Sequence, residues 1–211
     1  NSRQISFAKA YSIQLPMMIN DWRRRWGQGD FPFLWAQLPN FKAVNPDPNA
    51  PSIWAHTRES MAKTLAMPNT GMATTIDIGE ARDIHPKNKQ DVGRRLANWA
   101  LAEFYYQKDV PTSGPMYASH KIEGATVRVQ FRYAAGLKAK VGDAVTGFVL
   151  AGADKVFHPA TAVVTEDGLV EVTSKAVAKP AALRYGWADN PVVNLVNQHN
   201  LPATPFRTDD W

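Results

Sequence analysis

The chain has 211 residues, of which 45% are hydrophobic and 20% charged, a globular composition that can fill one large domain or two small ones. It has no cysteine, which excludes a disulfide scaffold and a cysteine nucleophile, and no apolar run of about 18 residues, so no membrane span is expected. The net charge is +5, but the basic cluster Arg23 to Arg25 has no accompanying Gly-rich or aromatic basic stripe, so nucleic acid is not an expected partner.

The chain is expected to begin with a helix and a buried strand. Apolar side chains recur at helical spacing over residues 5–26, where Pro16 either kinks or restarts the helix and Gly27 ends it. The nearly continuous apolar run from Phe31 to Leu38 is typical of a strand that is buried on both faces in a parallel sheet.

A helix, a strand and another helix follow. Ser52 suits the N-cap of a helix that runs to about Ala66, and the run from Met72 to Ile78 predicts a second buried strand. A third amphipathic helix is expected from Lys87 to Tyr106. This order is half of an open α/β sheet, and because sheets usually have about four to six strands, we expect the missing strands to lie outside this chain.

The pattern changes to alternation from about Asp109, after a linker over Val110 to Pro115. Short strands separated by turn signals are typical of a β-sandwich. The sequence therefore predicts an α/β domain over residues 1–108 and an all-β sandwich domain over residues 109–211. The expected strands of the second domain cover residues 127–133, 144–150, 161–165, 169–173 and 181–187.

The loop after Ile78 is the first place to look for chemistry, because ligands bind beyond the carboxyl ends of strands in open α/β sheets. Pro86 suits the first position of a helix, which makes His85 the expected N-cap residue. The positive end of the helix dipole favours a neutral histidine, which suits a general base, and Asp83 could orient its ring. The alternative is an ordinary Asp-x-His at a helix start with no catalytic role.

No other motif points to a cofactor. The sequence has no His-x-x-x-His or carboxylate cluster at metal spacing, no phosphate loop and no dinucleotide fingerprint. We therefore expect no metal and no organic cofactor.

Eight segments resemble the sialate O-acetylesterase-like family of SGNH-hydrolase carbohydrate acetylesterases. They cover residues 21–41, 54–64, 67–77 and 83–96 in the first half, and residues 119–124, 147–154, 184–190 and 205–211 in the second. The resemblance implies the C-terminal half of a flavodoxin-like SGNH-hydrolase domain followed by the β-sandwich. It also implies a secreted or periplasmic setting.

The activity that this resemblance implies is that of a serine esterase that releases acetate from acetylated sugars, such as sialic acid or plant polysaccharide. His85 and Asp83 stand where the family has its base and the residue that orients it. The wider superfamily spaces this pair as Asp-x-x-His, whereas this chain has Asp-x-His, which leaves Asp77 as a substitute for Asp83.

The nucleophile of the family lies in a Gly-Gln-Ser-Asn motif that this sequence does not contain. The expected partner is therefore an N-terminal portion of the same enzyme that carries the serine. The alternative hypothesis is a non-catalytic carbohydrate-binding fragment in which the β-sandwich carries the function.

Substrate-binding candidates border the expected site. Asn40 follows the first strand, and Arg58 with Glu59 matches a family-typical pair, for which the alternative is a structural ion pair. Trp54 could stack on a sugar, although a helical tryptophan more often belongs to the core.

Overall fold

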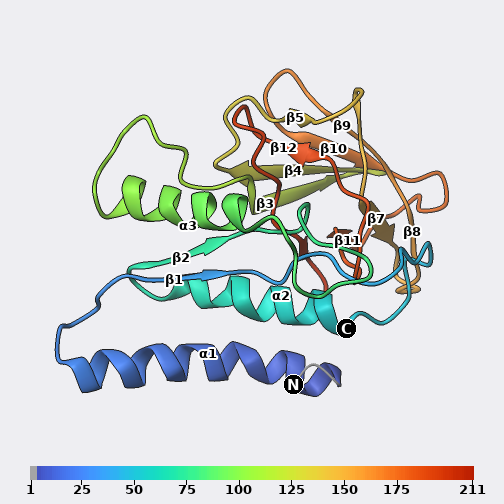
Figure 1. Ribbon diagram of the computed structural model, residues 1–211. Helices are drawn as coiled ribbons and strands as arrows, with labels where there is room; N and C mark the ends of the chain where they lie inside the picture. Colours follow the sequence, from blue (N-terminus) through green and yellow to red (C-terminus); the bar gives the residue numbers. More distant parts are fainter. Residues whose placement is uncertain (1–3) are drawn as a thin grey trace. The chain divides into compact units, whose positions relative to one another are not determined.

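The computed structural model describes residues 4–211 (Figure 1). The chain divides into two compact units, one formed by Asn1–Phe41 with Ser52–Ser113 and the other by Lys42–Pro51 with Gly114–Trp211. The loop over residues 42–51, which the sequence assigns to the first domain, thus groups with the second unit. The domain limits 1–108 and 109–211 remain a prediction.

Helix α1, Ile5–Trp26, is a single helix that continues through Pro16. It ends at Gly27, whose φ of 64° is the left-handed conformation that glycine adopts without strain and whose N–H donates to the Arg23 carbonyl at 3.1 Å. The predicted stop at Gly27 is therefore confirmed, and Pro16 does not restart the helix.

Helix α2, Ile53–Lys63, and the 3-10 turn η1, Thr64–Ala66, confirm the second predicted helix. The Ser52 side chain caps α2 by accepting the Ala55 N–H at 3.0 Å. Helix α1 packs against α2, and the Ser60 hydroxyl donates to the Ala8 carbonyl at 2.7 Å. The two helices therefore form one layer of the first unit.

Strands β1, Phe33–Ala36, and β2, Thr70–Ala73, pair in parallel with Phe33 opposite Thr70. Strand β2 ends well before Ile78, because the Thr74 carbonyl accepts a hydrogen bond from Arg95 and the Thr75 hydroxyl donates to Gln37. The predicted strand bounds are therefore wrong at this end.

Burial on both faces is also not observed for β1. Trp35 is its one buried residue, while the other three are half-buried. The described residues therefore do not bury β1 as fully as its apolar sequence predicts.

Helix α3, Lys89–Glu103, contacts both strands. It lies on the opposite side of the two-stranded sheet from α2 (Figure 1). Gly71 allows this approach, since a Cβ there would stand 2.6 Å from the Trp99 ring. The first unit is thus layered as helices, sheet and helix.

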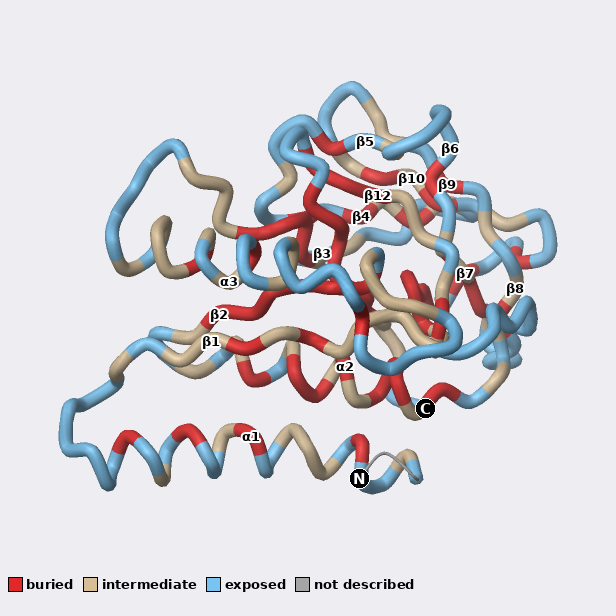
Figure 2. Tube along the Cα trace, in the orientation of Figure 1, coloured by how far each residue is buried: buried red, intermediate tan, exposed pale blue. Residues whose placement is uncertain are grey.

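The second unit contains antiparallel sheets with the strand orders β3-β4-β10-β9-β6 and β13-β11-β7-β8, and a small β12-β5 pair. Side chains from both larger sheets share one apolar core, which includes Val129, Leu150 and Tyr185. Buried stretches of these strands are red in the backbone trace of Figure 2. The strands are β3 Met116–Glu123, β4 Thr126–Arg132, β5 Lys138–Ala139, β6 Ala144–Val145, β7 Phe148–Ala151, β8 Phe157–Pro159, β9 Thr161–Val164, β10 Val170–Thr173, β11 Ala182–Tyr185, β12 Leu195–Val196 and β13 Phe206–Arg207.

One predicted strand, residues 144–150, is wrong because the chain turns a corner inside it. Strands β6 and β7 belong to different sheets, and Gly147 between them has a φ of 99°. A Cβ at Gly147 would lie 2.7 Å from Val193 Cγ1, so backbone conformation and space both require glycine. Apolar periodicity does not register such a corner.

The loop over residues 42–51 is tied to the second unit by side chains. Asn49 Nδ2 donates to the Phe157 carbonyl at 2.9 Å, and its Oδ1 accepts the Phe157 N–H at 2.8 Å. Lys42 forms an ion pair with Asp189 at 2.5 Å.

Within residues 4–211, no helix is both long and apolar enough to cross a membrane.

We predict that Gly71→Ala destabilises the protein by about 1–3 kcal/mol, because the added methyl group overlaps the Trp99 ring and the Leu34 side chain. Gly93→Ala is the matched control: Gly93 is exposed in α3 with open space around its Cβ position. It should raise the free energy of unfolding by up to about 1 kcal/mol through helix propensity. Urea unfolding monitored by circular dichroism measures both, and equal effects would contradict the packing at Gly71.

Candidate active site

The candidate site is built from the two loops that follow β1 and β2. Because the strands are parallel, their carboxyl ends meet at one edge of the sheet. Residues 38–41 follow β1 at this edge, and residues 74–88 connect β2 to α3.

Asn40 joins these two loops. Its Oδ1 accepts the Gly79 N–H at 2.7 Å, and Phe41 forms a parallel β-bridge with Glu80. A Cβ on Gly79 would lie 1.9 Å from the Asn40 carbonyl oxygen, so glycine is required for this close approach. Asn40 therefore positions the beginning of the loop that carries Asp83 and His85.

Asp83 and His85 contact each other in that loop. The Asp83 carboxylate accepts the His85 backbone N–H at 2.9 Å, and its Oδ1 lies 3.5 Å from His85 Nδ1. The His85 side chain is 85% exposed and that of Asp83 48%. The backbone N–H of His85 is the main cause that lowers the pKa of Asp83, so this carboxylate is ionised at neutral pH beside an accessible imidazole.

The predicted helix start at His85 is wrong. Helix α3 begins at Lys89, and its N-cap is Asn88, whose Oδ1 accepts the Asp91 N–H at 3.1 Å. His85 lies in the exposed loop before this cap, so the helix dipole no longer supports its role as a base. The observation that still supports this role is the contact of His85 with Asp83.

Arg58 lies under the loop after β1. Its side chain is fully buried, with Nε donating to the Leu38 carbonyl at 2.9 Å and Nη2 to the Pro39 carbonyl at 2.7 Å. Trp54 is also buried, and its Nε1 donates to the same Pro39 carbonyl at 2.9 Å. These bonds hold the turn that precedes Asn40.

Glu59 points to neighbours on its own helix. Its carboxylate lies 3.3 Å from Lys63 Nζ and 3.9 Å from His56 Nδ1. Asp77, the substitute for Asp83, forms a two-pronged ion pair with Arg95 at 2.6 and 2.8 Å. Its carboxylate thus fastens the loop to α3, which leaves Asp83 as the acidic neighbour of His85.

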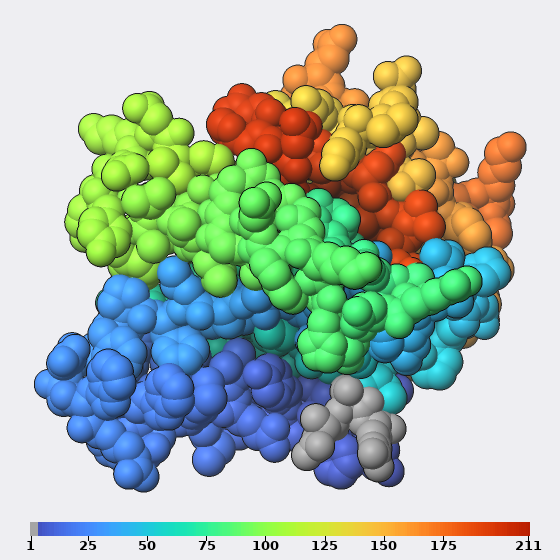
Figure 3. Space-filling model, viewed as in Figure 1, coloured from blue at the N-terminus to red at the C-terminus, as the bar shows by residue number. Residues whose placement is uncertain are grey.

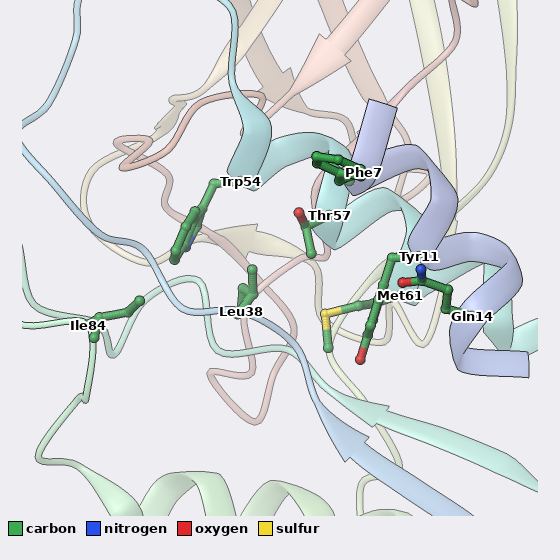
Figure 4. Close-up of a pocket in the computed structure, with 9 residues that line it drawn as sticks. Phe7, Tyr11, Gln14, Leu38, Trp54, Thr57, Met61 and Ile84 are labelled. Carbon is green, nitrogen blue, oxygen red and sulfur yellow. The ribbon is translucent and has the colours of Figure 1, made fainter. Parts of the chain in front are cut away.

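An apolar pocket of about 270 Å³ adjoins these loops (Figure 4). Phe7 and Tyr11 of α1, Trp54 and Met61 of α2, and Ile84 beside His85 contribute to its lining. The sequence analysis did not single out this pocket, because its side chains come from four separate segments and carry no motif. Within residues 4–211 no three His, Asp or Glu side chains gather where they could hold a metal ion.

Known proteins resemble this chain in sequence and in fold. No protein-family model matches the chain. A solved carbohydrate acetylesterase from Xanthomonas citri superposes on 97% of this chain with a TM-score of 0.90 and 46% sequence identity. In fold and in sequence the chain is therefore similar to SGNH-type acetylesterases.

Curated relatives make this more specific. The mouse sialate O-acetylesterase is 28% identical over 93% of the chain, and the human protein of that name is 33% identical over 50%. The resemblance to sialate O-acetylesterase-like proteins that the sequence predicts is thus confirmed.

The matched region is less than half of these proteins. The chain covers 40% of the mouse protein and 47% of the Xanthomonas chain. What the whole proteins do therefore enters below as a proposal.

We predict that Asn40→Ala lowers the free energy of unfolding by about 1–3 kcal/mol, because the partly buried Gly79 N–H loses its acceptor. Asn40→Asp keeps an acceptor oxygen at this position and should lose less. Chemical denaturation of both variants provides the comparison, and equal losses would mean that the Gly79 contact is not what Asn40 contributes.

The titration of Asp83 gives a second prediction. A pKa below the ordinary value of 3.8 means that the contact with the His85 amide is complete at higher pH and is lost as the pH falls through the lowered pKa. Because the backbone N–H is the main cause, His85→Ala should leave most of the depression in place. Carboxyl NMR titration checks this, and a return to about 3.8 in the variant would identify the imidazole as the cause instead.

Proposed function

We propose that this chain is the C-terminal half of a serine carbohydrate O-acetylesterase. In this proposal the first unit forms part of a flavodoxin-like SGNH-hydrolase domain and the second unit is its β-sandwich accessory domain. The observation that carries the proposal is the Asp83–His85 contact beyond the end of β2, in a chain that is 46% identical to a carbohydrate acetylesterase of the same fold.

His85 is the general base and later the general acid. Its Nδ1 lies toward the ionised Asp83, which leaves Nε2 to take a proton from a serine hydroxyl. The serine oxygen then attacks the acetyl carbonyl carbon, and the imidazolium returns the proton to the sugar oxygen as the C–O bond breaks. Water, activated by the same imidazole, hydrolyses the acetyl-enzyme.

Asp83 orients the ring and stabilises the imidazolium that forms in each half-reaction. The 3.5 Å separation is longer than a hydrogen bond, and catalytic contacts of this kind shorten when substrate binds. A base that is 85% exposed also needs a cover that excludes water from the reacting atoms.

The serine belongs to a separate N-terminal portion of the enzyme. The sequence has no Gly-Gln-Ser-Asn string, and the relatives extend well beyond the matched region. That portion would supply both the nucleophile and the cover over His85.

Acetylated carbohydrate is the proposed substrate class. Asn40 borders the site directly, and Arg58 acts on it through the carbonyls of Leu38 and Pro39. Glu59 follows Arg58 in the middle of α2, where its carboxylate lies near Lys63 and His56. Acetylated sialic acid and acetylated plant polysaccharide both satisfy this chemistry.

We predict that His85→Ala lowers kcat/KM for acetate release by about 10⁴-fold or more in the assembled enzyme, with little change in stability, because the side chain is exposed. Asp83→Asn should cause a large but smaller loss. His158→Ala, a histidine on β8 of the other unit, is the control. Acetate release from an acetylated sugar is the assay, and near-normal turnover by the His85 variant would exclude it from the mechanism.

A serine-reactive phosphonate separates this proposal from a carbohydrate-binding fragment. Labelling of a companion polypeptide that purifies with this chain supports the esterase. Folded, assembled protein that stays unlabelled but binds sugar would instead favour the binding role.

A further inference from the structure

The loop that carries Asp83 and His85 is closed by the side chain of Glu80. Its Oε1 accepts the backbone N–H of Lys87 at 3.0 Å, seven residues further along the chain. Because Lys87 directly precedes the N-cap residue of α3, this hydrogen bond joins the beginning of the loop to its end. The loop lies at the surface of the molecule in Figure 3, where residues 79–88 are drawn green.

The backbone of Glu80 is itself held in place. It forms a parallel β-bridge with Phe41 and an antiparallel β-bridge with Asp83. The preceding residue, Gly79, donates its N–H to Asn40 Oδ1 at 2.7 Å. The Glu80 side chain therefore ties the end of the loop to a residue that is already fixed against the loop after β1.

The main contact of Glu80 with Lys87 is the hydrogen bond to the backbone rather than the ion pair. The Lys87 ammonium lies 3.7 Å from Glu80 Oε2, and its side chain is 83% exposed, so water weakens this attraction. The bond from the N–H has ordinary length, and a charged acceptor makes such a bond roughly twice as strong as a neutral one. An acceptor oxygen at the position of Oε1 is therefore what closes the loop.

The position of His85 depends on how the ends of this loop are held. The His85 side chain is 85% exposed, and the carboxylate that it contacts, that of Asp83, belongs to the same loop. A contact within the loop sets how the two side chains face each other, but it does not set where the pair stands relative to the strands. Pro86 is buried, and the bond from Lys87 to Glu80 follows directly after it. These two anchors therefore place the imidazole.

We propose that Glu80 is a positioning residue of the esterase, which places the His85 imidazole to accept the serine proton by closing the loop through the Lys87 N–H. Glu80 contacts no reacting atom in this proposal and acts only through the backbone of residues 80–87. The inference rests on the proposed function, in which His85 is the general base. Displacement of a catalytic group by about 1 Å can cost about 100-fold in rate, so the closure of this loop matters for turnover.

Kinetics of the assembled enzyme with an acetylated sugar test this role. Glu80→Ala removes the acceptor and should lower kcat by at least about tenfold. KM should change by less than about twofold, because the base moves while the contacts with the sugar stay. Glu80→Gln keeps an acceptor oxygen at the same reach and should retain kcat to within about threefold of the wild type. Unchanged kcat in Glu80→Ala would overturn the proposal.

A matched control separates the backbone bond from the charge. Glu103→Ala makes the same substitution at the exposed far end of α3 and should leave kcat within about twofold of the wild type. Glu80→Gln removes the negative charge that attracts the Lys87 ammonium, so a retained kcat would assign the effect to the backbone bond. If Glu80→Gln lost as much activity as Glu80→Ala, the charge would be the cause and the proposal would be overturned.

Two further readouts do not depend on turnover. Hydrogen exchange of the Lys87 amide, followed by NMR, should be at least about tenfold faster in Glu80→Ala and nearly unchanged in Glu80→Gln. The pKa of Asp83 should stay lowered in both variants, because its main cause, the His85 N–H, lies within the loop. A return of this pKa to about 3.8 in Glu80→Ala would mean that the pair itself comes apart, which would overturn the displacement of an intact pair.

These outcomes distinguish this inference from the proposed function. Near-normal acetate release by His85→Ala would overturn the esterase mechanism, even if exchange of the Lys87 amide still depended on Glu80. A Lys87 amide that exchanges equally fast with and without the Glu80 carboxylate would overturn the positioning role and leave the esterase mechanism standing.

Discussion

The fully buried guanidinium of Arg58 donates to the carbonyls of Leu38 and Pro39, directly after β1. Hydrogen bonds from a charged donor in a dry environment are strong, and removal of the donor would take this bond from both carbonyls, leaving Trp54 Nε1 as a donor to Pro39. The turn formed by Leu38 and Pro39 positions Asn40, whose side chain accepts the Gly79 N–H. The loop that begins at Gly79 carries Asp83 and His85, so the position of this pair depends on the turn. The geometry of the exposed Asp83–His85 pair thus depends on the buried side chain of Arg58.

The first unit also shows how a sheet can end against a helix. Trp99 and Arg95 reach from α3 to carbonyls that a further strand would otherwise use, and Arg95 binds Asp77 as well. The same helix therefore covers the edge of β2 and fastens the loop that leads to the site. On the other side of β1, no strand of residues 4–211 pairs with it.

The sequence predicted the ends of helices correctly where one residue alone decides them. Ser52 caps α2 and Gly27 ends α1 because each needs only its own backbone conformation and a bond within one turn. His85 was different. Its position before Pro86 predicted a cap, but Asn88 competes for the same role three residues later, and its bond to Asp91 decides where α3 begins.

The sequence by itself determined the alternation of helices and strands in the first half, the β-rich second half and the resemblance to carbohydrate acetylesterases, since these depend on periodicity and on residue strings. Only the tertiary structure decided that Arg95 engages Asp77, that Gly147 divides a predicted strand between two sheets, and that Arg58 supports the turn before Asn40. Each of these depends on atoms from segments distant in the chain, and periodicity along one segment carries no record of what packs against it.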